Sequence, residues 1–286
     1  MQTTKVAVLG LGIIGSAWAR NLIEDGLDVR PWNRTPQPDF PHFEADAATA
    51  ADGADLIIIV VADPKAVESV LDAIEPKLGA GQIVVQSSTI SAHWSKQFAE
   101  RVEKTGARFL EAPFTGSKLA AQARQTVYYL GGDEATLSDA RPVLERLSKT
   151  ILHIGPLGTA STLKLAMNLN IAAIAGALNE GLTLCRQSGI ADETFFDALH
   201  QNVSRSGVSD LKEPKLIAQD YSPQFSVKHM EKDLRLALET AREIGLELPE
   251  TQAVRSVYQQ GLASDMGDAD FSALIQLLDS LKPNAD

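Results

Sequence analysis

The chain has 286 residues, a formal net charge of −11 at pH 7 and a mean hydropathy of −0.05. This length allows two domains, and a hydrophobic content of 44% is enough for ordinary packed cores. The acidic charge argues against nucleic acid or an anionic membrane surface as the main partner. The single cysteine, Cys185, excludes an internal disulfide and a multi-cysteine metal site, and it suits a reducing compartment. We expect a cytoplasmic protein that binds no metal, nucleic acid or membrane.

The first predicted element is a short apolar strand over residues 5–9, followed at once by the pattern G-x-G-x-x-G. A helical pattern follows over 16–23, and a second strand pattern ends at Trp32. In this setting the three glycines allow a tight turn, close approach of a pyrophosphate and packing of the helix on the strand. The helix start adds free N–H groups and a positive dipole. The pattern predicts a dinucleotide site made by Gly10, Leu11, Gly12, Ile13, Ile14 and Gly15.

The residues after the second strand indicate which dinucleotide binds. An acidic residue there would bind the ribose 2′-hydroxyl of NAD and repel a 2′-phosphate. This chain has Asn33, Arg34 and Thr35 instead. Arg34 can stack on adenine and pair with the phosphate, while Asn33 and Thr35 can donate hydrogen bonds to it. The alternative is a solvated turn with an incidental arginine. We predict NADP(H) as the cofactor. Pro31 removes a ladder donor from this strand, and the sequence offers no reason for it.

Up to about residue 155 the sequence alternates strand and helix patterns. Residues 56–61 form a continuous apolar run, as a central parallel strand requires. Ligands of doubly wound sheets lie beyond the carboxyl ends of the strands, so Val61 and Ala62 are further candidates for the cofactor site. The alternation predicts an α/β Rossmann domain with a doubly wound, mostly parallel sheet. Other strand-like runs are 83–85, 108–110 and 126–130, and helical stretches include 66–74 and 135–147.

After residues 155–158 the strand patterns stop, and the rest is helical with short breaks, one of them at Pro214. A change from α/β to all-α at a Gly-Pro-x-Gly connection predicts a domain boundary near residue 157. We predict an NADP-binding Rossmann domain over 1–157 and an all-α substrate and dimerisation domain over 158–286. A long interdomain helix links the two.

The first helical pattern of the second part, about 161–187, carries Lys164 and Asn168 on one polar stripe. At 100° per residue the stripe is about 60° wide on an otherwise apolar helix. Its polar residues argue against a membrane span. A buried ammonium costs several kcal/mol unless it is paired or solvated. The structural alternative is a lysine that extends to the surface or pairs with a carboxylate. We predict that Lys164 is catalytic.

Four segments together resemble the β-hydroxyacid dehydrogenase family, which includes 3-hydroxyisobutyrate dehydrogenase and the glyoxylate/succinic semialdehyde reductases. Each segment alone is weak evidence for the family, whereas the four segments together are specific to it. In chain order they are the glycine turn with Asn33-Arg34-Thr35, the segment 111–118 (EAPFTGSK), Gly158 with Lys164 and Asn168, and Phe225 through Lys232-Asp233 to Leu248-Pro249.

The resemblance implies a role for each matching residue near the substrate. Lys164 would donate a proton to the carbonyl oxygen, and Asn168 would hold the substrate. The substrate carboxylate would be bound by Thr115, Gly116 and Ser117.

The resemblance also implies further cofactor contacts and an oligomeric state, and the chain departs from the family pattern at a few positions. Thr89 would approach the nicotinamide, and Lys232 would close over the cofactor. A homodimer or homotetramer would form through the long helix. The family's serine and valine in the substrate loop are Thr115 and Phe114 here, and Arg124 either supplies a second cation or is simply exposed.

These observations predict an NADPH-dependent reductase that transfers hydride to a small aldehyde or keto acid, a semialdehyde or glyoxylate-like compound. One alternative is an imine reductase or reductive aminase, although those enzymes generally carry Asp or Tyr where this chain has Lys164. Another is a non-catalytic NADPH-binding sensor.

Overall fold

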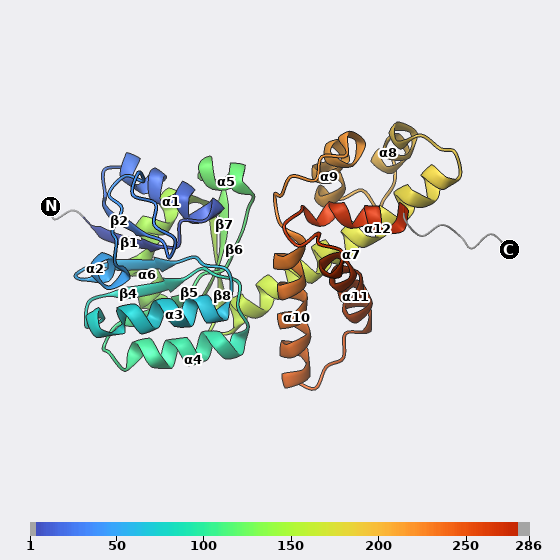
Figure 1. The fold of residues 1–286 in the computed structure, drawn as a ribbon. Helices are drawn as coiled ribbons and strands as arrows, with labels where there is room; N and C mark the ends of the chain where they lie inside the picture. Colours follow the sequence, from blue (N-terminus) through green and yellow to red (C-terminus); the bar gives the residue numbers. More distant parts are fainter. Residues whose placement is uncertain (1–3, 280–286) are drawn as a thin grey trace. The chain divides into compact units, whose positions relative to one another are not determined.

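The computed structural model describes residues 4–279 and divides into two compact units, Met1–Leu165 and Ala166–Asp286. The first unit is built from strands and helices and the second from helices, which confirms the predicted fold class (Figure 1). The long helix α7 (Thr159–Gln187) begins in the first unit and continues into the second. The boundary between residues 157 and 158 stays a prediction.

The first unit alternates strands and helices along most of its length. Its strands are β1 (Lys5–Leu9), β2 (Asp28–Trp32), β3 (Leu56–Ile59), β4 (Ile83–Gln86), β5 (Arg108–Glu111), β6 (Phe114–Thr115), β7 (Thr126–Gly131) and β8 (Ser148–Gly155). Its other helices are α1 (Ile13–Glu24), α2 (Ala47–Ala51), α3 (Pro64–Ile74), α4 (Ala92–Glu103), α5 (Lys118–Gln122), α6 (Glu134–Leu144) and the 3₁₀ turns η1 (Glu75–Lys77) and η2 (Glu145–Leu147).

All eight strands form one sheet in the order β2-β1-β3-β4-β5-β7-β6, with β8 paired to β7. The strands β2, β1, β3, β4 and β5 are parallel, and β7 is antiparallel to β5 and β6. Helices α1, α5 and α6 pack on one face, and α2, α3 and α4 pack on the other (Figure 1). Because the strand order reverses between β1 and β3, the carboxyl ends of these strands form the switch point at which such sheets bind ligands.

Two strands, β6 and β8, have no counterpart in the sequence patterns. β6 spans only two residues, and most side chains of β8 are exposed or half-buried, so neither shows an apolar run. β8 pairs with β7 alone, at the edge of the sheet. Central strands are apolar because both of their faces are buried, and β8 is not buried in this way.

The position of β2 explains Pro31. β2 is an edge strand that pairs only with β1, and Pro31 lies opposite Val8. The Pro31 carbonyl accepts a hydrogen bond from the Glu44 N–H (2.8 Å), on the side away from β1. The missing N–H of Pro31 is on that same side, so the ladder with β1 loses no donor.

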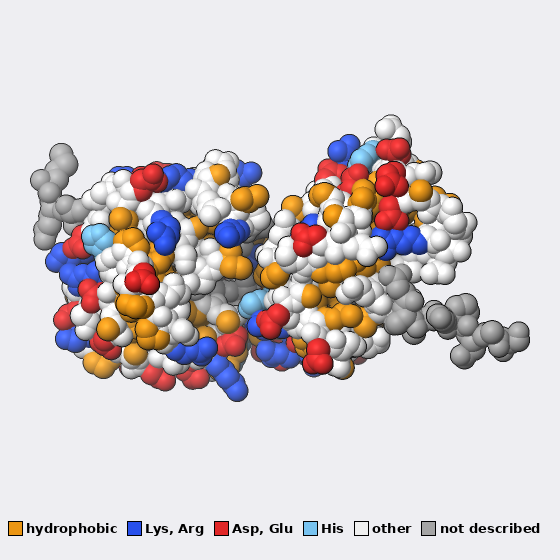
Figure 2. Space-filling view, turned by 45° about the horizontal axis from the view of Figure 1, so that its top comes forward, with side chains coloured by type: hydrophobic (Ala, Val, Ile, Leu, Met, Phe, Trp, Pro, Cys, Tyr) orange, Lys and Arg blue, Asp and Glu red, His pale blue; other side chains and the backbone are white. Residues whose placement is uncertain are grey.

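Charges of both signs are interspersed on the surface drawn in Figure 2. On that face the Lys and Arg side chains do not gather into one large basic patch. The expectation that nucleic acid is not a partner stays a prediction.

The second unit has a helical core built around α7. Within residues 4–279, α7 is the one helix long and apolar enough to cross a membrane by length and composition. Its buried Ala172 and Ala175 pack with Val227 and Met230, as in the core helix of a globular domain. The other helices are α8 (Asp192–His200), α9 (Gly207–Ala218), α10 (Val227–Glu243), α11 (Pro249–Ala263), η3 (Phe271–Leu274) and α12 (Ile275–Asp279).

The predicted break at Pro214 is wrong, because α9 continues through it. A proline inside a helix costs a backbone hydrogen bond and meets the preceding turn. The buried Lys212, Lys215 and Leu216 lie on both sides of the proline, so tertiary packing outweighs this local cost.

A buried ion pair between Lys212 and Asp270 holds the start of α10. Lys212 is 1% exposed and Asp270 is 0% exposed, and Lys212 Nζ lies 2.8 Å from Asp270 Oδ1. Burial alone would raise the pKa of Asp270, but the hydrogen bonds and charge of Lys212 and the backbone N–H of Gln224 outweigh burial and hold this pKa below its usual value. The same carboxylate accepts the N–H of Phe225 (3.3 Å), so the ion pair fixes the loop that leads into α10.

Replacing Asp270 should test this anchor. Asp270→Asn leaves the Lys212 charge buried without a counter-charge and should lower the free energy of unfolding by about 3–5 kcal/mol in urea titrations. Asp268→Asn is the control, because that carboxylate is 89% exposed and pairs with Lys228 at the surface. The control should leave the free energy of unfolding close to that of the wild type. Equal effects of the two substitutions would contradict the anchor.

Candidate active site

The glycine turn after β1 has the geometry that the sequence predicts. A Cβ on Gly10 would lie 2.3 Å from the Val60 carbonyl oxygen, and one on Gly15 would lie 1.9 Å from the Gly10 carbonyl oxygen. Gly10 also has a φ of +115°. A Cβ on Gly12 would meet nothing within 4 Å. Gly10 and Gly15 are therefore required by close packing, whereas Gly12 borders open space where a ligand can approach the backbone.

The start of α1 is suited to an anion. Its N-cap residue, Gly12, makes no side-chain capping hydrogen bond, and the first turn carries no acidic residue. Such a helix start offers backbone N–H groups and a positive dipole. The residues present thus fit the pyrophosphate of a dinucleotide.

At the tip of β2, the Asn33 side chain is used differently from those of Arg34 and Thr35. Asn33 Oδ1 accepts the N–H of Leu11 (2.9 Å), and Asn33 Nδ2 donates to the Thr35 carbonyl (2.9 Å). Arg34 and Thr35 are exposed. The Asn33 side chain is thus used to hold the chain's own backbone, and Arg34 and Thr35 remain the better candidates for a 2′-phosphate.

The ends of β3 and β4 are joined by buried polar side chains. The Val61 N–H donates to Ser88 Oγ (2.8 Å). Gln86, which is 0% exposed, accepts the Ser88 N–H (2.6 Å) and donates to the Ser88 carbonyl (3.0 Å). This network fixes the two loops in which Val61 with Ala62 and Thr89 lie.

The predicted substrate loop begins on β6. Thr115 pairs with Val127 of β7, and Gly116 has a φ of +144°, which favours glycine. Ser117 Oγ accepts the Ala120 N–H (3.3 Å) at the start of α5. The Ser117 hydroxyl hydrogen is therefore the part of this group that can be donated to a ligand.

The two larger departures from the family pattern have structural explanations. Phe114 packs edge-on against Trp18, with ring centroids 4.8 Å apart, in the core beside α1. Arg124 pairs with Glu24 (3.0 Å) and Asp25 (3.1 Å) at the end of α1. The Arg124 guanidinium is therefore not merely exposed, because these ion pairs fasten the segment after α5 to the end of α1. The second role, as a cation for a substrate carboxylate, stays a prediction.

A buried carboxylate fixes the start of α7. Glu111, at the end of β5, is 0% exposed. Its Oε1 accepts the N–H groups of Gly158 and Ala160, both at 2.8 Å. Its Oε2 accepts the hydroxyls of Ser95 (2.6 Å) and Ser161 (2.7 Å). Four donors thus satisfy one charged group, and they hold α7 against the carboxyl end of the sheet.

Lys164 and Asn168 follow on this helix at successive turns. Lys164 is 8% exposed and lies one turn beyond Ala160. Asn168 is 3% exposed, and its Nδ2 donates to Asp233 Oδ2 (2.5 Å). Lys232 Nζ lies 2.9 Å from Asp233 Oδ1, so in the second unit one buried carboxylate contacts both Asn168 and Lys232.

His229 lies near this cluster on α10. Burial lowers the pKa of His229, and the charges of Lys232 and Lys228 lower it further. Its Nδ1 is 2.7 Å from Ser226 Oγ. These effects favour the neutral form of His229. Among residues 4–279, no group of three or more His, Cys, Asp and Glu side chains is arranged to hold a metal ion.

Sequence reasoning assigned no role to three residues of this region: Glu111, Gln86 and Asp233. The first two are polar residues that end apolar strands, and they lie opposite each other in the β4–β5 register. That pattern was a usable signal, because a buried polar group needs partners. Asp233 had no such signal beyond its place after Lys232.

Two glycine variants should separate folding from binding. Gly12→Ala places a methyl group in open space at a φ of −72°, so the melting temperature should stay close to that of the wild type. The methyl group should weaken dinucleotide binding about tenfold or more, because it blocks close approach to the backbone. Gly15→Ala drives a Cβ into the Gly10 carbonyl and should destabilise the protein by about 1–3 kcal/mol or more. Wild-type dinucleotide affinity of Gly12→Ala would contradict this assignment.

Comparisons with known proteins agree with the geometry of both units. Residues 5–155 match the family described as the NAD binding domain of 6-phosphogluconate dehydrogenase. Residues 158–278 match the family described as NAD-binding of NADP-dependent 3-hydroxyisobutyrate dehydrogenase.

Individual relatives cover nearly the whole chain. Glyoxylate/succinic semialdehyde reductase 1 of Arabidopsis thaliana is 31% identical, over 95% of this chain and 97% of its own length. The chloroplastic reductase 2 of the same plant is 31% identical, over 99% of this chain and 81% of its own length. The solved structure of Mycobacterium tuberculosis 3-hydroxyisobutyrate dehydrogenase with L-serine has a TM-score of 0.88 at 27% identity, covering 98% of this chain and 100% of that one. The chain belongs to the β-hydroxyacid dehydrogenase family and carries its nicotinamide-dinucleotide-binding domain.

Proposed function

We propose that this protein is an NADPH-dependent reductase that acts on the carbonyl of a small aldehyde or keto acid, of the semialdehyde or glyoxylate type. The observation that carries the proposal is the position of Lys164. This buried lysine follows a helix start that Glu111 fixes in the same unit as the glycine turn. The relatives named as glyoxylate/succinic semialdehyde reductases support carbonyl chemistry.

The reaction requires a hydride at the carbonyl carbon and a proton at the carbonyl oxygen. A bound dihydronicotinamide supplies the hydride. Lys164 gives the proton from Nζ to the oxygen on which negative charge develops, and the product is the alcohol. Asn168 presents an uncharged amide one turn further along α7. Its hydrogen bond to Asp233 (2.5 Å) holds that amide in one orientation.

The substrate carboxylate is proposed to bind the loop formed by Thr115, Gly116 and Ser117. The hydroxyls and backbone N–H groups of such a turn can donate to a carboxylate. This loop and Lys164 belong to the same compact unit.

The experiment that tests the proposal follows NADPH oxidation with succinic semialdehyde, glyoxylate and cyclic imines. Turnover of the carbonyl acids is expected. Turnover of cyclic imines alone would replace the proposal with an imine reductase, and tight NADPH binding without any turnover would indicate a sensor. Binding of neither NADPH nor NADH would overturn the proposed function.

The cofactor preference should depend on Arg34. We expect kcat/KM with NADPH to exceed that with NADH at least tenfold, because one charge-assisted contact to the 2′-phosphate contributes about 1.5–3 kcal/mol. Asn33→Asp with Arg34→Ala should remove or invert this preference. Arg30→Ala is the control, because the Arg30 guanidinium donates to the Asp52 carbonyl (2.7 Å) and should not alter the ratio. A wild-type protein that prefers NADH would contradict the assignment.

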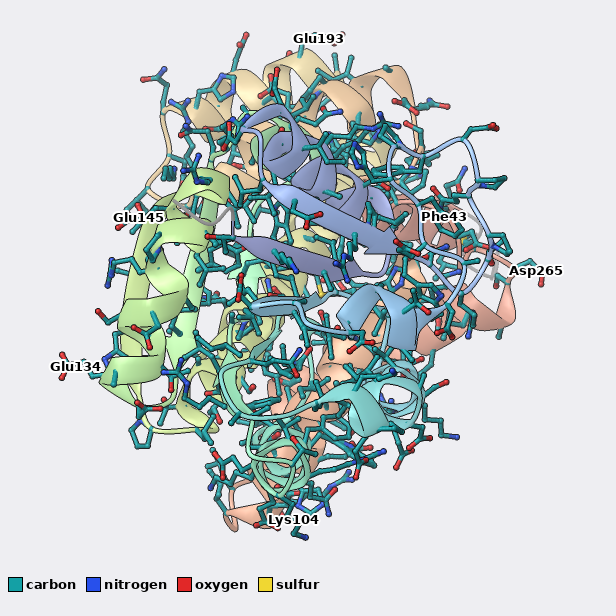
Figure 3. The ribbon with its side chains drawn as sticks, turned by 90° about the vertical axis from the view of Figure 1, so that its left-hand side faces the viewer. Phe43, Lys104, Glu134, Glu145, Glu193 and Asp265 are labelled. Carbon is teal, nitrogen blue, oxygen red and sulfur yellow. The ribbon has the colours of Figure 1, made fainter. Side chains whose placement is uncertain are left out.

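Replacing Lys164 should separate a proton donor from a structural lysine. Lys164→Ala should lower kcat by about 10²–10⁴, the usual contribution of a general acid. The Kd for NADPH should change only a few-fold, because the glycine turn and Arg34 are unaltered. Lys104→Ala, at an exposed lysine after α4 (Figure 3), should leave kcat unchanged. A lower melting temperature with near-normal kcat would show that Lys164 is structural.

A further inference from the structure

The peptide groups of Leu11, inside the glycine turn, are held by three side chains. The Leu11 N–H donates to Asn33 Oδ1 (2.9 Å). The Leu11 carbonyl accepts from Ser16 Oγ (2.9 Å) and from Gln37 Nε2 (3.2 Å). These side chains come from two places, namely α1 and the loop after β2, on which Phe43 is labelled in Figure 3.

Two of these side chains bracket the segment that carries Arg34. Asn33 and Gln37 lie on either side of the exposed Arg34 and Thr35, and the Asn33 amide also donates to the Thr35 carbonyl (2.9 Å). The segment proposed to bind a 2′-phosphate is thus hydrogen-bonded, at both ends, to the turn suited to a pyrophosphate.

A glycine-rich turn has more conformational freedom to lose than other segments. Ordering such a turn when a ligand binds reduces affinity, whereas a turn already held in its bound shape avoids that cost. The hydrogen bonds to Leu11 restrict both peptide groups between Gly10 and Gly12, where a pyrophosphate would approach.

We infer that Gln37 and Ser16 are positioning residues for dinucleotide binding, and that with Asn33 they join the two phosphate-binding segments into one preformed site. The inference rests on the proposed function. Gln37 and Ser16 act through the Leu11 carbonyl, so their loss affects the part of the site that NADPH and NADH share. Arg34 acts on the 2′-phosphate, which only NADPH carries.

This difference separates a positioning residue from a direct ligand. If Gln37 bound the 2′-phosphate itself, its loss would weaken NADPH and leave NADH unchanged. The structure instead uses its amide N–H on the Leu11 carbonyl. The ratio of the two dissociation constants therefore distinguishes the two roles.

The experiment titrates the full-length protein with NADPH and with NADH and follows nucleotide fluorescence, which requires no turnover. Gln37→Met keeps the length of the side chain and removes its donor, and Ser16→Ala removes the second donor to the same carbonyl. Each should raise both dissociation constants by the same factor, about two- to tenfold, the effect of one neutral hydrogen bond. Gln97→Met, at an exposed glutamine on α4, is the matched control and should change neither. Arg34→Ala should raise the dissociation constant of NADPH much more than that of NADH, and so change their ratio.

Several results would overturn the inference. Wild-type affinity in both Gln37→Met and Ser16→Ala, or a loss confined to NADPH, would do so. Melting temperatures without nucleotide show whether each variant is folded, and Ser16→Ala serves if Gln37→Met is not. A wild-type protein that binds neither nucleotide would overturn the proposed function instead, so the two failures are distinguishable.

Discussion

The hydrogen-bonded carboxylate of Glu111 is the interaction on which the arrangement of the first unit depends. A fully buried charge is costly unless its oxygens are satisfied, and here each oxygen accepts two donors. The donors come from α4 and from the start of α7, so one side chain joins β5 to both helices. Gly131 makes room for it, because a Cβ there would lie 2.1 Å from Oε1. Helical geometry then carries Lys164 one turn beyond the residues that Glu111 holds.

Polar residues at the ends of neighbouring strands organise the carboxyl edge of the sheet. Gln86 and Glu111 are opposite each other in β4 and β5, and both are completely buried. Gln86 is hydrogen-bonded to the Ser88 backbone in the loop that contains Thr89, and Ser88 Oγ accepts the Val61 N–H. Glu111 accepts hydrogen bonds from the start of α7. The apolar strand interiors supply stability, and their polar last residues determine where the loops lie. The same edge therefore combines a packed core with the loops suited to a cofactor.

The sequence predicted the features that come from strong local patterns and missed those that depend on pairing across the chain. The glycine turn and the central parallel strands have such patterns, and their placement is confirmed. β8 has no apolar run because most of its side chains are not buried, and Pro214 was misjudged because buried neighbours hold α9 across it. Sequence identified Asn33 as a possible donor, but it did not show that this donor is used within the chain. The role of Asp233 likewise appears only when α10 lies beside α7 in the second unit.

The residues that depart from the family pattern differ in what they contact in the structure. Phe114 contacts Trp18 and Tyr128 beside the core, so packing accommodates its larger ring. Arg124 donates to two carboxylates at the end of α1 and to the backbone carbonyls of Asn21 in α1 and Arg146 in η2. An arginine so engaged would have to break several charge-assisted bonds to meet a second substrate carboxylate. Thr115 is the departure that stays within the substrate loop, where it keeps the hydroxyl of the family's serine and adds a methyl group.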